Sequence, residues 1–240
     1  MRVALFVTCL ADLFRPSVAF ASIKLLEQAG CEVTVPLLQT CCGQPAYNSG
    51  DYEATVPLAR QVITMLEAAE HVVVPSGSCT SMICHHYPRL LEGVWRDRAL
   101  ELAAKTFELT VFLKDIARIK PQGNSPSEFP AVTYHDGCAG LRDLDIREQP
   151  RQLLRDLCGI EISELQQSEV CCGFGGTFSV KNEPVSTAMA QQKVQNALET
   201  GAEYIVSTDA SCLIHLDSYI RKNKLPLKTI HIIDVLASGW

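Results

Sequence analysis

The stretch Cys171-Cys172-Gly173-Phe174-Gly175-Gly176 places two adjacent thiols on a glycine-rich loop. Glycine adopts positive φ at little steric cost, so this loop can turn tightly beside its two thiols. A shorter copy of the motif, Cys41-Cys42-Gly43, occurs earlier in the chain. Two such pairs in one chain indicate a duplicated metal-binding or redox site.

The surroundings of the two cysteine pairs are repeated as well. In each half a single cysteine, Cys9 or Cys138, follows an apolar run and precedes the pair by 32 or 33 positions. A further cysteine, Cys79 or Cys212, follows a second apolar run, 37 or 40 positions after the pair. The offset between corresponding positions stays between 129 and 133 residues, which indicates an internal repeat.

The repeat predicts two similar halves, residues 1–120 and 131–240, joined by a linker over 121–130 that is rich in proline. Strand-like and helix-like segments alternate in both, so the predicted fold is α/β, with a mostly parallel sheet flanked by helices in each half. The expected strands are residues 2–8, 32–36, 72–74, a short one near 107, 131–135, 160–163 and 203–207. The expected helices are residues 16–30, 51–69, 80–91, 95–105, 145–157 and 184–199, and residues 228–236 should repeat the strand and helix over 106–116.

The charge, the length of the apolar runs and the cysteine content exclude several classes of function. The net charge of −6 comes without any basic block, which argues against a nucleic-acid partner. The apolar runs are too short to span a membrane, and the run over 3–7 is too short for a signal peptide. We therefore expect a cytoplasmic protein whose thiols stay reduced. In that setting eleven cysteines indicate metal or redox chemistry rather than disulfides.

The cysteine spacing separates iron–sulfur chemistry from zinc. Loops after the carboxyl ends of parallel strands gather at one edge of a sheet, so each half should bring four thiols together. Structural zinc usually takes two short Cys-x-x-Cys hooks, whereas adjacent thiolates more easily hold two irons of one cluster. The spacing therefore favours an iron–sulfur cluster over zinc. The expected ligands are Cys9, Cys41, Cys42 and Cys79 in the first half and Cys138, Cys171, Cys172 and Cys212 in the second.

The other cysteines, and the polar residues before Cys138, are expected to pack or to form hydrogen bonds and not to bind a metal. Cys31 and Cys158 have no counterpart in the opposite half and are expected to be small buried hydrophobes. Cys84 lies beside two histidines, but a packing role is favoured for it too. His135 and Asp136 precede Cys138 and are expected to form hydrogen bonds around a cluster without binding it.

The cysteine pattern of each half resembles the cysteine-rich CCG domain. In that pattern a single cysteine is followed after about thirty residues by Cys-Cys-Gly, and after about thirty-five more by another cysteine. That domain occurs in the B component of heterodisulfide reductase and in the iron–sulfur subunits of glycolate oxidase and anaerobic glycerol-3-phosphate dehydrogenase. The resemblance covers almost the full chain, and residues 134–138 and 171–180 are most similar to the lactate utilisation protein A family. It implies an iron–sulfur electron-transfer subunit with one or two 4Fe–4S clusters. Its partners would be other subunits of a complex that oxidises L-lactate or a related 2-hydroxy acid.

The chain departs from the family at two positions. Members with a noncubane cluster end each motif in Cys-x-x-Cys, whereas this chain has Met82 and His215 at those places. His215 is therefore a candidate additional ligand, and Met82 is expected to pack in the interior. The sequence has no G-x-G-x-x-G fingerprint after a strand, so we expect no dinucleotide-binding site of that kind. A partner subunit would then carry out hydride transfer. Two alternatives remain open: a thiol–disulfide catalyst similar to heterodisulfide reductase, and a zinc-binding protein without redox function.

Overall fold

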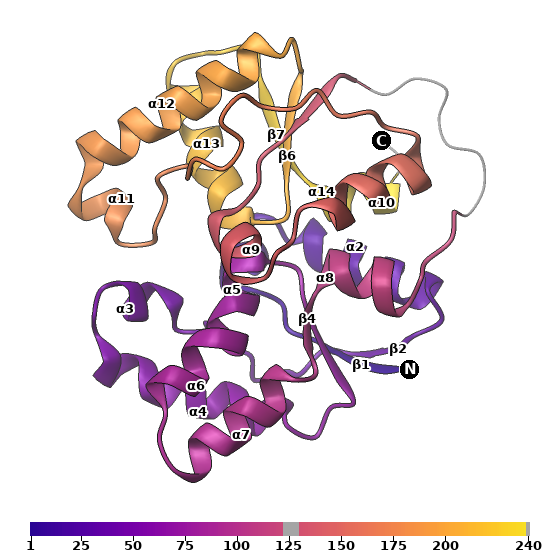
Figure 1. Cartoon of the computed structure of the whole chain (residues 1–240), viewed down its shortest axis with the longest axis vertical. Helices are drawn as coiled ribbons and strands as arrows, with labels where there is room; N and C mark the ends of the chain where they lie inside the picture. The colour runs from indigo at the N-terminus through magenta and orange to yellow at the C-terminus, as the bar shows by residue number, and fades with distance from the viewer. Residues whose placement is uncertain (122–129, 239–240) are drawn as a thin grey trace.

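The computed structural model describes residues 1–121 and 130–238 and confirms the α/β class, with two parallel sheets flanked by helices (Figure 1). Residues 122–129, which make up most of the expected linker, lie outside the described residues, so the domain boundary there stays a prediction. In Figure 1 the first half occupies the lower part of the molecule and the second half the upper part.

The first sheet has the strand order β2-β1-β3-β4, with every neighbouring pair parallel. Its strands are β1 (Arg2–Leu5), β2 (Glu32–Thr34), β3 (His71–Val74) and β4 (Thr106–Glu108). Strands β1 and β3 lie in the middle, and their apolar side chains are buried on both faces of the sheet. Continuous apolar runs are typical of such doubly covered parallel strands.

The second sheet has the order β5-β6-β7, again parallel, with β5 (Val132–Tyr134), β6 (Tyr204–Ser207) and β7 (Lys228–His231). The expected strand over 160–163 is wrong: this segment makes only an isolated bridge between Val132 and Ile162. The hydroxyl of Thr133 donates to the carbonyl oxygen of Ser163 at 2.6 Å, in place of a main-chain N–H. The hydrogen-bond ladder therefore stops after one bridge.

A helix begins within about three residues of each position predicted from the sequence. The helices over residues 9–14, 44–48, 138–143, 178–181 and 210–222 were not predicted. In the first half the helices are α1 (Cys9–Phe14), α2 (Ser17–Gln28), α3 (Gln44–Asn48), α4 (Tyr52–Leu66), α5 (Gly77–Ser81), the π-helical turn η1 (Met82–His86), α6 (Tyr87–Leu90), α7 (Val94–Ala103), α8 (Leu109–Val111) and the π-helical turn η2 (Phe112–Ile116). In the second half they are α9 (Cys138–Asp143), α10 (Glu148–Cys158), α11 (Phe178–Lys181), α12 (Glu183–Glu199), α13 (Ala210–Lys222) and α14 (Ile232–Ser238). Asp51 caps α4 as expected, because its side chain accepts a hydrogen bond from the main-chain N–H of Ala54.

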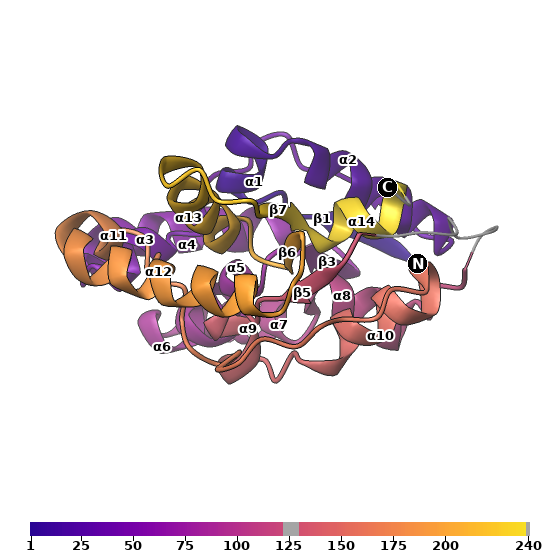
Figure 2. The same ribbon diagram turned by 90° about the horizontal axis from the view of Figure 1, so that it is seen from above.

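The two halves pack on each other in a reciprocal way. Helix α2 of the first half packs on α14 of the second, and α10 of the second packs on α8 and η2 of the first. Figure 2 shows α2 and α14 side by side from above. Near the middle of the molecule, α5 packs on α9 and α1 on α13. Each half thus uses corresponding elements to contact the other, as expected for an internal duplication.

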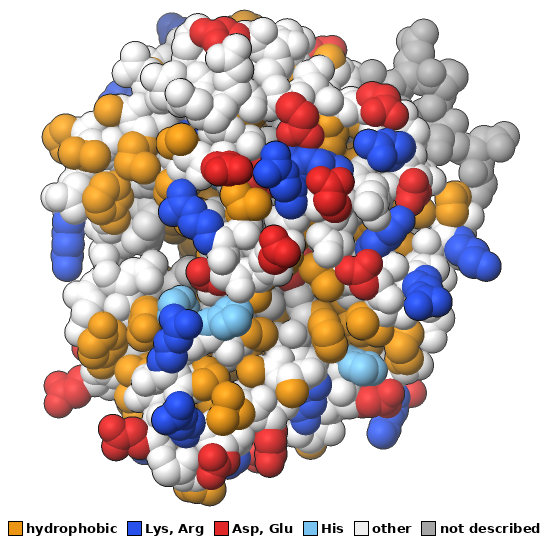
Figure 3. All heavy atoms as spheres, viewed as in Figure 1, with side chains coloured by type: hydrophobic (Ala, Val, Ile, Leu, Met, Phe, Trp, Pro, Cys, Tyr) orange, Lys and Arg blue, Asp and Glu red, His pale blue; other side chains and the backbone are white. Residues whose placement is uncertain are grey.

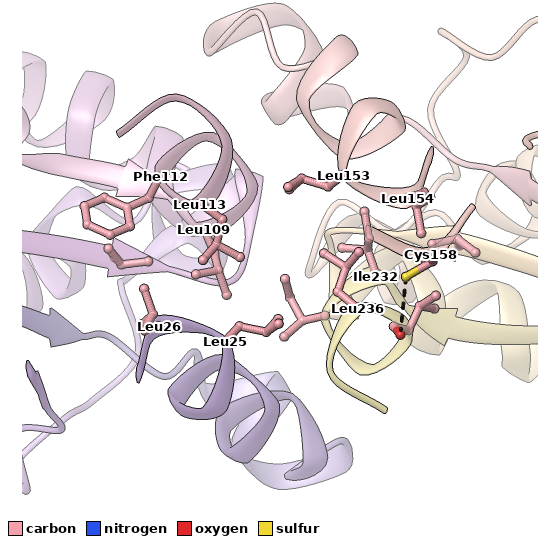
Figure 4. Close-up of a cluster of buried hydrophobic side chains, with 14 of the residues drawn as sticks. Leu25, Leu26, Leu109, Phe112, Leu113, Leu153, Leu154, Cys158, Ile232 and Leu236 are labelled. Carbon is pink, nitrogen blue, oxygen red and sulfur yellow. Dashed lines mark hydrogen bonds between the residues drawn. The ribbon is translucent and has the colours of Figure 1, made fainter. Parts of the chain in front are cut away.

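One hydrophobic core spans both halves. Leu25, Leu109 and Phe112 from the first half pack in the same buried cluster as Leu154 and Ile232 from the second (Figure 4). Burying a side chain of this size contributes roughly 1.5–3 kcal/mol. The halves therefore share a core and are not independently packed units.

The surface carries no continuous charged stripe on the face drawn in Figure 3, where acidic and basic side chains are interspersed. Within residues 1–121 and 130–238, no helix combines the length and the apolar character that crossing a membrane requires.

Candidate metal centre

The structure brings together the four cysteines expected in the first half. Cys9 begins α1 just after β1, and Cys79 lies in α5 just after β3. Cys41 and Cys42 lie on the loop before α3. The four thiols form a continuous chain, in which Cys9 contacts Cys41, Cys41 contacts Cys42, and the Sγ atoms of Cys42 and Cys79 are 3.3 Å apart.

The four cysteines of the second half repeat this arrangement. The Sγ atoms of Cys138 and Cys171 are 3.9 Å apart, and Cys171 also contacts Cys172. Cys172 in turn contacts Cys212, which lies in the first turn of α13. Both sets therefore have the same order of contacts, with the adjacent pair in the middle of the chain of thiols.

Glycine is required after each adjacent pair. Gly43 and Gly173 have φ values of 86° and 93°, in the left-handed region. In both loops the glycine N–H points back at the first cysteine of the pair, with 3.4 Å from N to Sγ of Cys41 or Cys171. A Cβ atom at Gly173 would lie 2.8 Å from Ser186 O and 2.8 Å from Met189 Cβ, so a side chain does not fit there.

This geometry favours the thiolate form of one cysteine in each set. Hydrogen bonds from Cys42, Cys9 and the N–H of Gly43 lower the pKa of Cys41 to about 3. The corresponding bonds from Cys138, Cys172 and Gly173 lower the pKa of Cys171 to about 2. The remaining thiols in contact with them have raised pKa values, because they donate to a neighbouring sulfur and are buried. Metal binding displaces protons from thiols, so a bound metal ion would favour the thiolate form of these cysteines.

His135 and Asp136 point in different directions. His135 is fully buried, and one of its ring nitrogens lies within 4.8 Å of the sulfurs of Cys172 and Cys212. The two carboxylate oxygens of Asp136 instead accept hydrogen bonds from the guanidinium of Arg151, each at 2.9 Å. Asp136 is thus held by α10, whereas His135 faces the thiols.

His215 and Met82 occupy the positions where family members carry a fifth cysteine. His215 Nε2 lies 3.2 Å from the hydroxyl of Ser186, which donates to the carbonyl oxygen of Gly173 at 2.8 Å. Among the described residues, the possible metal ligands that lie within 4.8 Å of one another are His135, Cys172 and Cys212, and His215 is not among them. Met82 is fully buried in the core of the first half, as expected for a packing residue.

The unpaired cysteines lie away from the two sets of thiols. Cys31 and Cys158 are buried in the core shared by the two halves. The thiol of Cys84 lies 3.6 Å from the carbonyl oxygen of Thr106, and burial raises its pKa to about 12. All three therefore stay protonated in this environment, as expected for packing residues.

Two functional candidates were missed by the sequence reasoning. Asp209 is buried, lines the pocket of the first-half thiols together with Phe174 and Gly176, and accepts hydrogen bonds from residues of the first half. Lys193 is almost fully buried near the second set of thiols, and its ammonium donates to the carbonyl oxygens of Gln167 and Ser168. The position of Asp209, three residues before Cys212, could have drawn attention to it. Nothing in the sequence indicated that Lys193 is buried near the thiols, because a lysine in a long helix is usually exposed.

Comparison with known proteins gives a consistent result over the whole chain. The model of the cysteine-rich domain CCG matches twice, at residues 3–84 and 132–217. Three relatives share the name "Lactate utilization protein A". The one from Exiguobacterium sp. is 48% identical, with 99% of this chain and 98% of the relative covered. The one from Halalkalibacterium halodurans is 44% identical, with 98% and 96% covered. The one from Bacillus thuringiensis is 42% identical, with 99% of both covered.

Among solved structures, a putative Asp/Glu racemase from Yersinia pestis aligns with 100% of this chain and 97% of its own at 11% identity. The TM-score is 0.38, which is too low to establish a shared fold.

Proposed function

Since the chain belongs to the lactate utilization protein A family and carries the cysteine-rich CCG domain twice, we propose that it is an iron–sulfur electron-transfer subunit of a lactate-oxidising system. The relatives' names support the role in lactate use. The observation that carries the iron–sulfur assignment is the presence of two sets of four thiols, each gathered at the carboxyl ends of parallel strands and linked in the same order.

Both sets of residues fit the binding of a cluster. Cysteine thiolates are the usual ligands of iron–sulfur clusters, and the adjacent pair offers two sulfurs to neighbouring irons. In this proposal Cys9, Cys41, Cys42 and Cys79 hold one cluster. Cys138, Cys171, Cys172 and Cys212 hold the other. When bound, each cluster would accept and release electrons singly.

The surrounding residues adjust the charge at each site. The N–H groups of Gly43 and Gly173 stabilise negative charge on the first sulfur of each pair. The buried ammonium of Lys193 places a positive charge near the second set of thiols. Such hydrogen bonds and charges set the potential at which a cluster takes up an electron. A hydride from lactate needs a flavin or nicotinamide, so another subunit carries out that step.

Anaerobic purification followed by iron and acid-labile sulfide analysis tests the proposal. We expect brown protein that contains both iron and sulfide and loses its colour in air. Colourless anaerobic protein that holds stoichiometric zinc would contradict the proposal and favour the zinc-binding alternative.

A thiol–disulfide catalyst is the second candidate, and one observation favours it. The thiol of Cys9 contacts Cys41, whose pKa is lowered to about 3, so that Cys41 favours the thiolate form. In such an enzyme the Cys41 thiolate would attack a disulfide substrate and release one thiol, and Cys9 would then displace the second thiol and form a Cys9–Cys41 disulfide. Reduced, iron-free protein that turns over a small disulfide would support this candidate over the first.

A further inference from the structure

His135 is a buried polar side chain whose hydrogen-bonding capacity is unused. Its exposed fraction is 0%, and neither ring nitrogen has a hydrogen-bond partner among the described residues. Leaving a buried polar group without a hydrogen-bond partner is destabilising, so such a group in the interior needs an explanation. A bound metal ion would provide the missing partner.

The surroundings of His135 supply the other ligands of such a site. One ring nitrogen and the sulfurs of Cys172 and Cys212 all lie within 4.8 Å of one another. Neutral imidazole and thiolate together are a common ligand set for iron and zinc. His215, the other histidine near this loop, already has Ser186 at hydrogen-bond distance and lies outside this group.

Among the described residues, the first half has no group of a histidine and two cysteines like that around His135. The main chain before the single cysteine nevertheless makes the same hydrogen bond in both halves. Phe6 corresponds to His135, since each lies three residues before the single cysteine of its half. The main-chain N–H of Phe6 donates to Val73 O at 2.9 Å, and that of His135 donates to Val206 O at 2.8 Å. Phe6 is buried in the apolar core of the first half. The two sites therefore differ by one potential ligand at the same point of the fold.

We propose that His135 is a metal ligand, so that the second half has a mixed imidazole–thiolate site and the first half an all-thiolate site. This inference rests on the proposed function only in assuming that the cysteine sets bind metal. It makes the two halves chemically distinct, despite the matching order of their cysteines.

Cobalt(II) provides a test that does not depend on lactate oxidation. The full-length protein with Cys42→Ser and Cys79→Ser loses the first site and keeps the second. Metal-free, reduced protein of this background is titrated anaerobically with cobalt(II), and the bound ion is examined by electron spin echo modulation. We expect modulation from the remote ring nitrogen of a coordinated histidine.

Substitution of His135 identifies the source of the modulation. His135→Phe copies the first half, and His135→Gln keeps a polar side chain in case the phenylalanine variant does not fold. Each should abolish the modulation and weaken cobalt(II) binding at least about tenfold, because even residues that only orient a ligand are worth that much. His215→Gln, the matched control, should preserve both.

Three outcomes would overturn the inference: no cobalt(II) bound in the background that retains His135, no nitrogen modulation there, or modulation that survives in the folded His135 variants. The iron and sulfide analysis decides the proposed function separately. Protein with iron and sulfide but without histidine modulation would refute the ligand role alone. Zinc in place of iron, together with His135-dependent modulation, would refute the proposed function alone.

Discussion

The carboxylate of Asp209, in the second half, accepts hydrogen bonds from the main-chain N–H and the hydroxyl of Ser78, in the first half, at 3.0 and 2.7 Å. The hydroxyl of Ser76 donates to the same carboxylate at 2.9 Å. These residues lie at the start of α5, the helix that carries Cys79. A carboxylate is well placed there, since helix amino termini favour negative charge. The second half thus helps to position a thiol of the first.

Replacing Asp209 should therefore weaken the first half. Asp209→Asn loses the charge and one of the oxygens that accept from Ser78, and we expect a decrease of about 1.5–3 kcal/mol in the free energy of unfolding. Urea unfolding of the metal-free protein measures this change. Ser211→Ala is the control, because its hydroxyl bonds Asp209 from within the second half and leaves the contact with Ser78 in place. An equal decrease in the free energy of unfolding for the two variants would show that the contact between Asp209 and Ser78 does not stabilise the protein more than the bond to Ser211 does.

Serine substitutions should separate ligands from buried cysteines. Cys42→Ser or Cys172→Ser should remove the iron of its own half, about half of the total, because a hydroxyl is a poor substitute for a soft thiolate. Cys31→Ser and Cys158→Ser, in the shared core, should retain the iron and lose only some stability. Iron and sulfide analysis of anaerobic protein gives the comparison. Similar iron loss in both groups would mean that the wrong cysteines have been assigned.

The ion pair between Arg151 and Asp136 should be important for stability, because the two side chains are only 7% and 1% exposed. Arg151→Met leaves a buried carboxylate without its partner, at a cost of about 3–5 kcal/mol. Adding Asp136→Asn should recover part of that loss, since the remaining group is then uncharged. Arg155→Met is the control, because its ion pair with Glu161 is exposed, and it should cost about 0.5 kcal/mol. Urea unfolding curves test all four proteins, and equal destabilisation by the two arginine variants would contradict the expectation.

Glu108 should make stability depend on pH. It is buried at the end of β4, where desolvation raises its pKa to about 7 from an ordinary value of 4.5. Because the folded pKa lies above the unfolded one, its contribution is fully present below about pH 4.5 and is lost as the pH rises to about 7. A pKa difference of one between the folded and unfolded states corresponds to about 1.4 kcal/mol, so the loss is about 3 kcal/mol.

Glu108→Gln tests this effect, because its amide cannot ionise. The difference in unfolding free energy between the natural protein and the variant should move in favour of the variant between pH 4.5 and pH 7.5. Using this difference removes the contributions of the buried histidines, which change in both proteins alike. A difference that stays constant with pH would show that Glu108 titrates normally.

The isolated chain should not oxidise lactate. The sequence contains no G-x-G-x-x-G fingerprint, and single-electron carriers do not accept a hydride. Purified protein with its metal loaded should give no lactate-dependent dye reduction, while addition of its partner subunits should. Dye reduction by the single chain would contradict its assignment as an electron-transfer subunit.

The sequence was sufficient to predict the α/β fold and the grouping of the cysteines. Both follow from local patterns, since apolar runs such as 72–74 mark parallel strands and the cysteines come directly after them. The strand expected over 160–163 was wrong because a side chain, Thr133, takes the place of a main-chain partner. Pairing between Asp209 and Ser78 depends on how the halves pack, and no spacing within one half encodes it. The direction of His135, toward the thiols and away from Asp136, likewise depends on tertiary contacts.

Because α14 packs on α2, the core shared by the two halves cannot close until residues 232–238 have left the ribosome. During synthesis the first half emerges before Ile232 and Leu236, which pack in the same buried cluster as Leu25, have been made. Helix α5 at that stage also lacks the carboxylate of Asp209. The nascent first half therefore carries its thiols on an incompletely packed fold, and metal insertion is expected to follow synthesis of the second half.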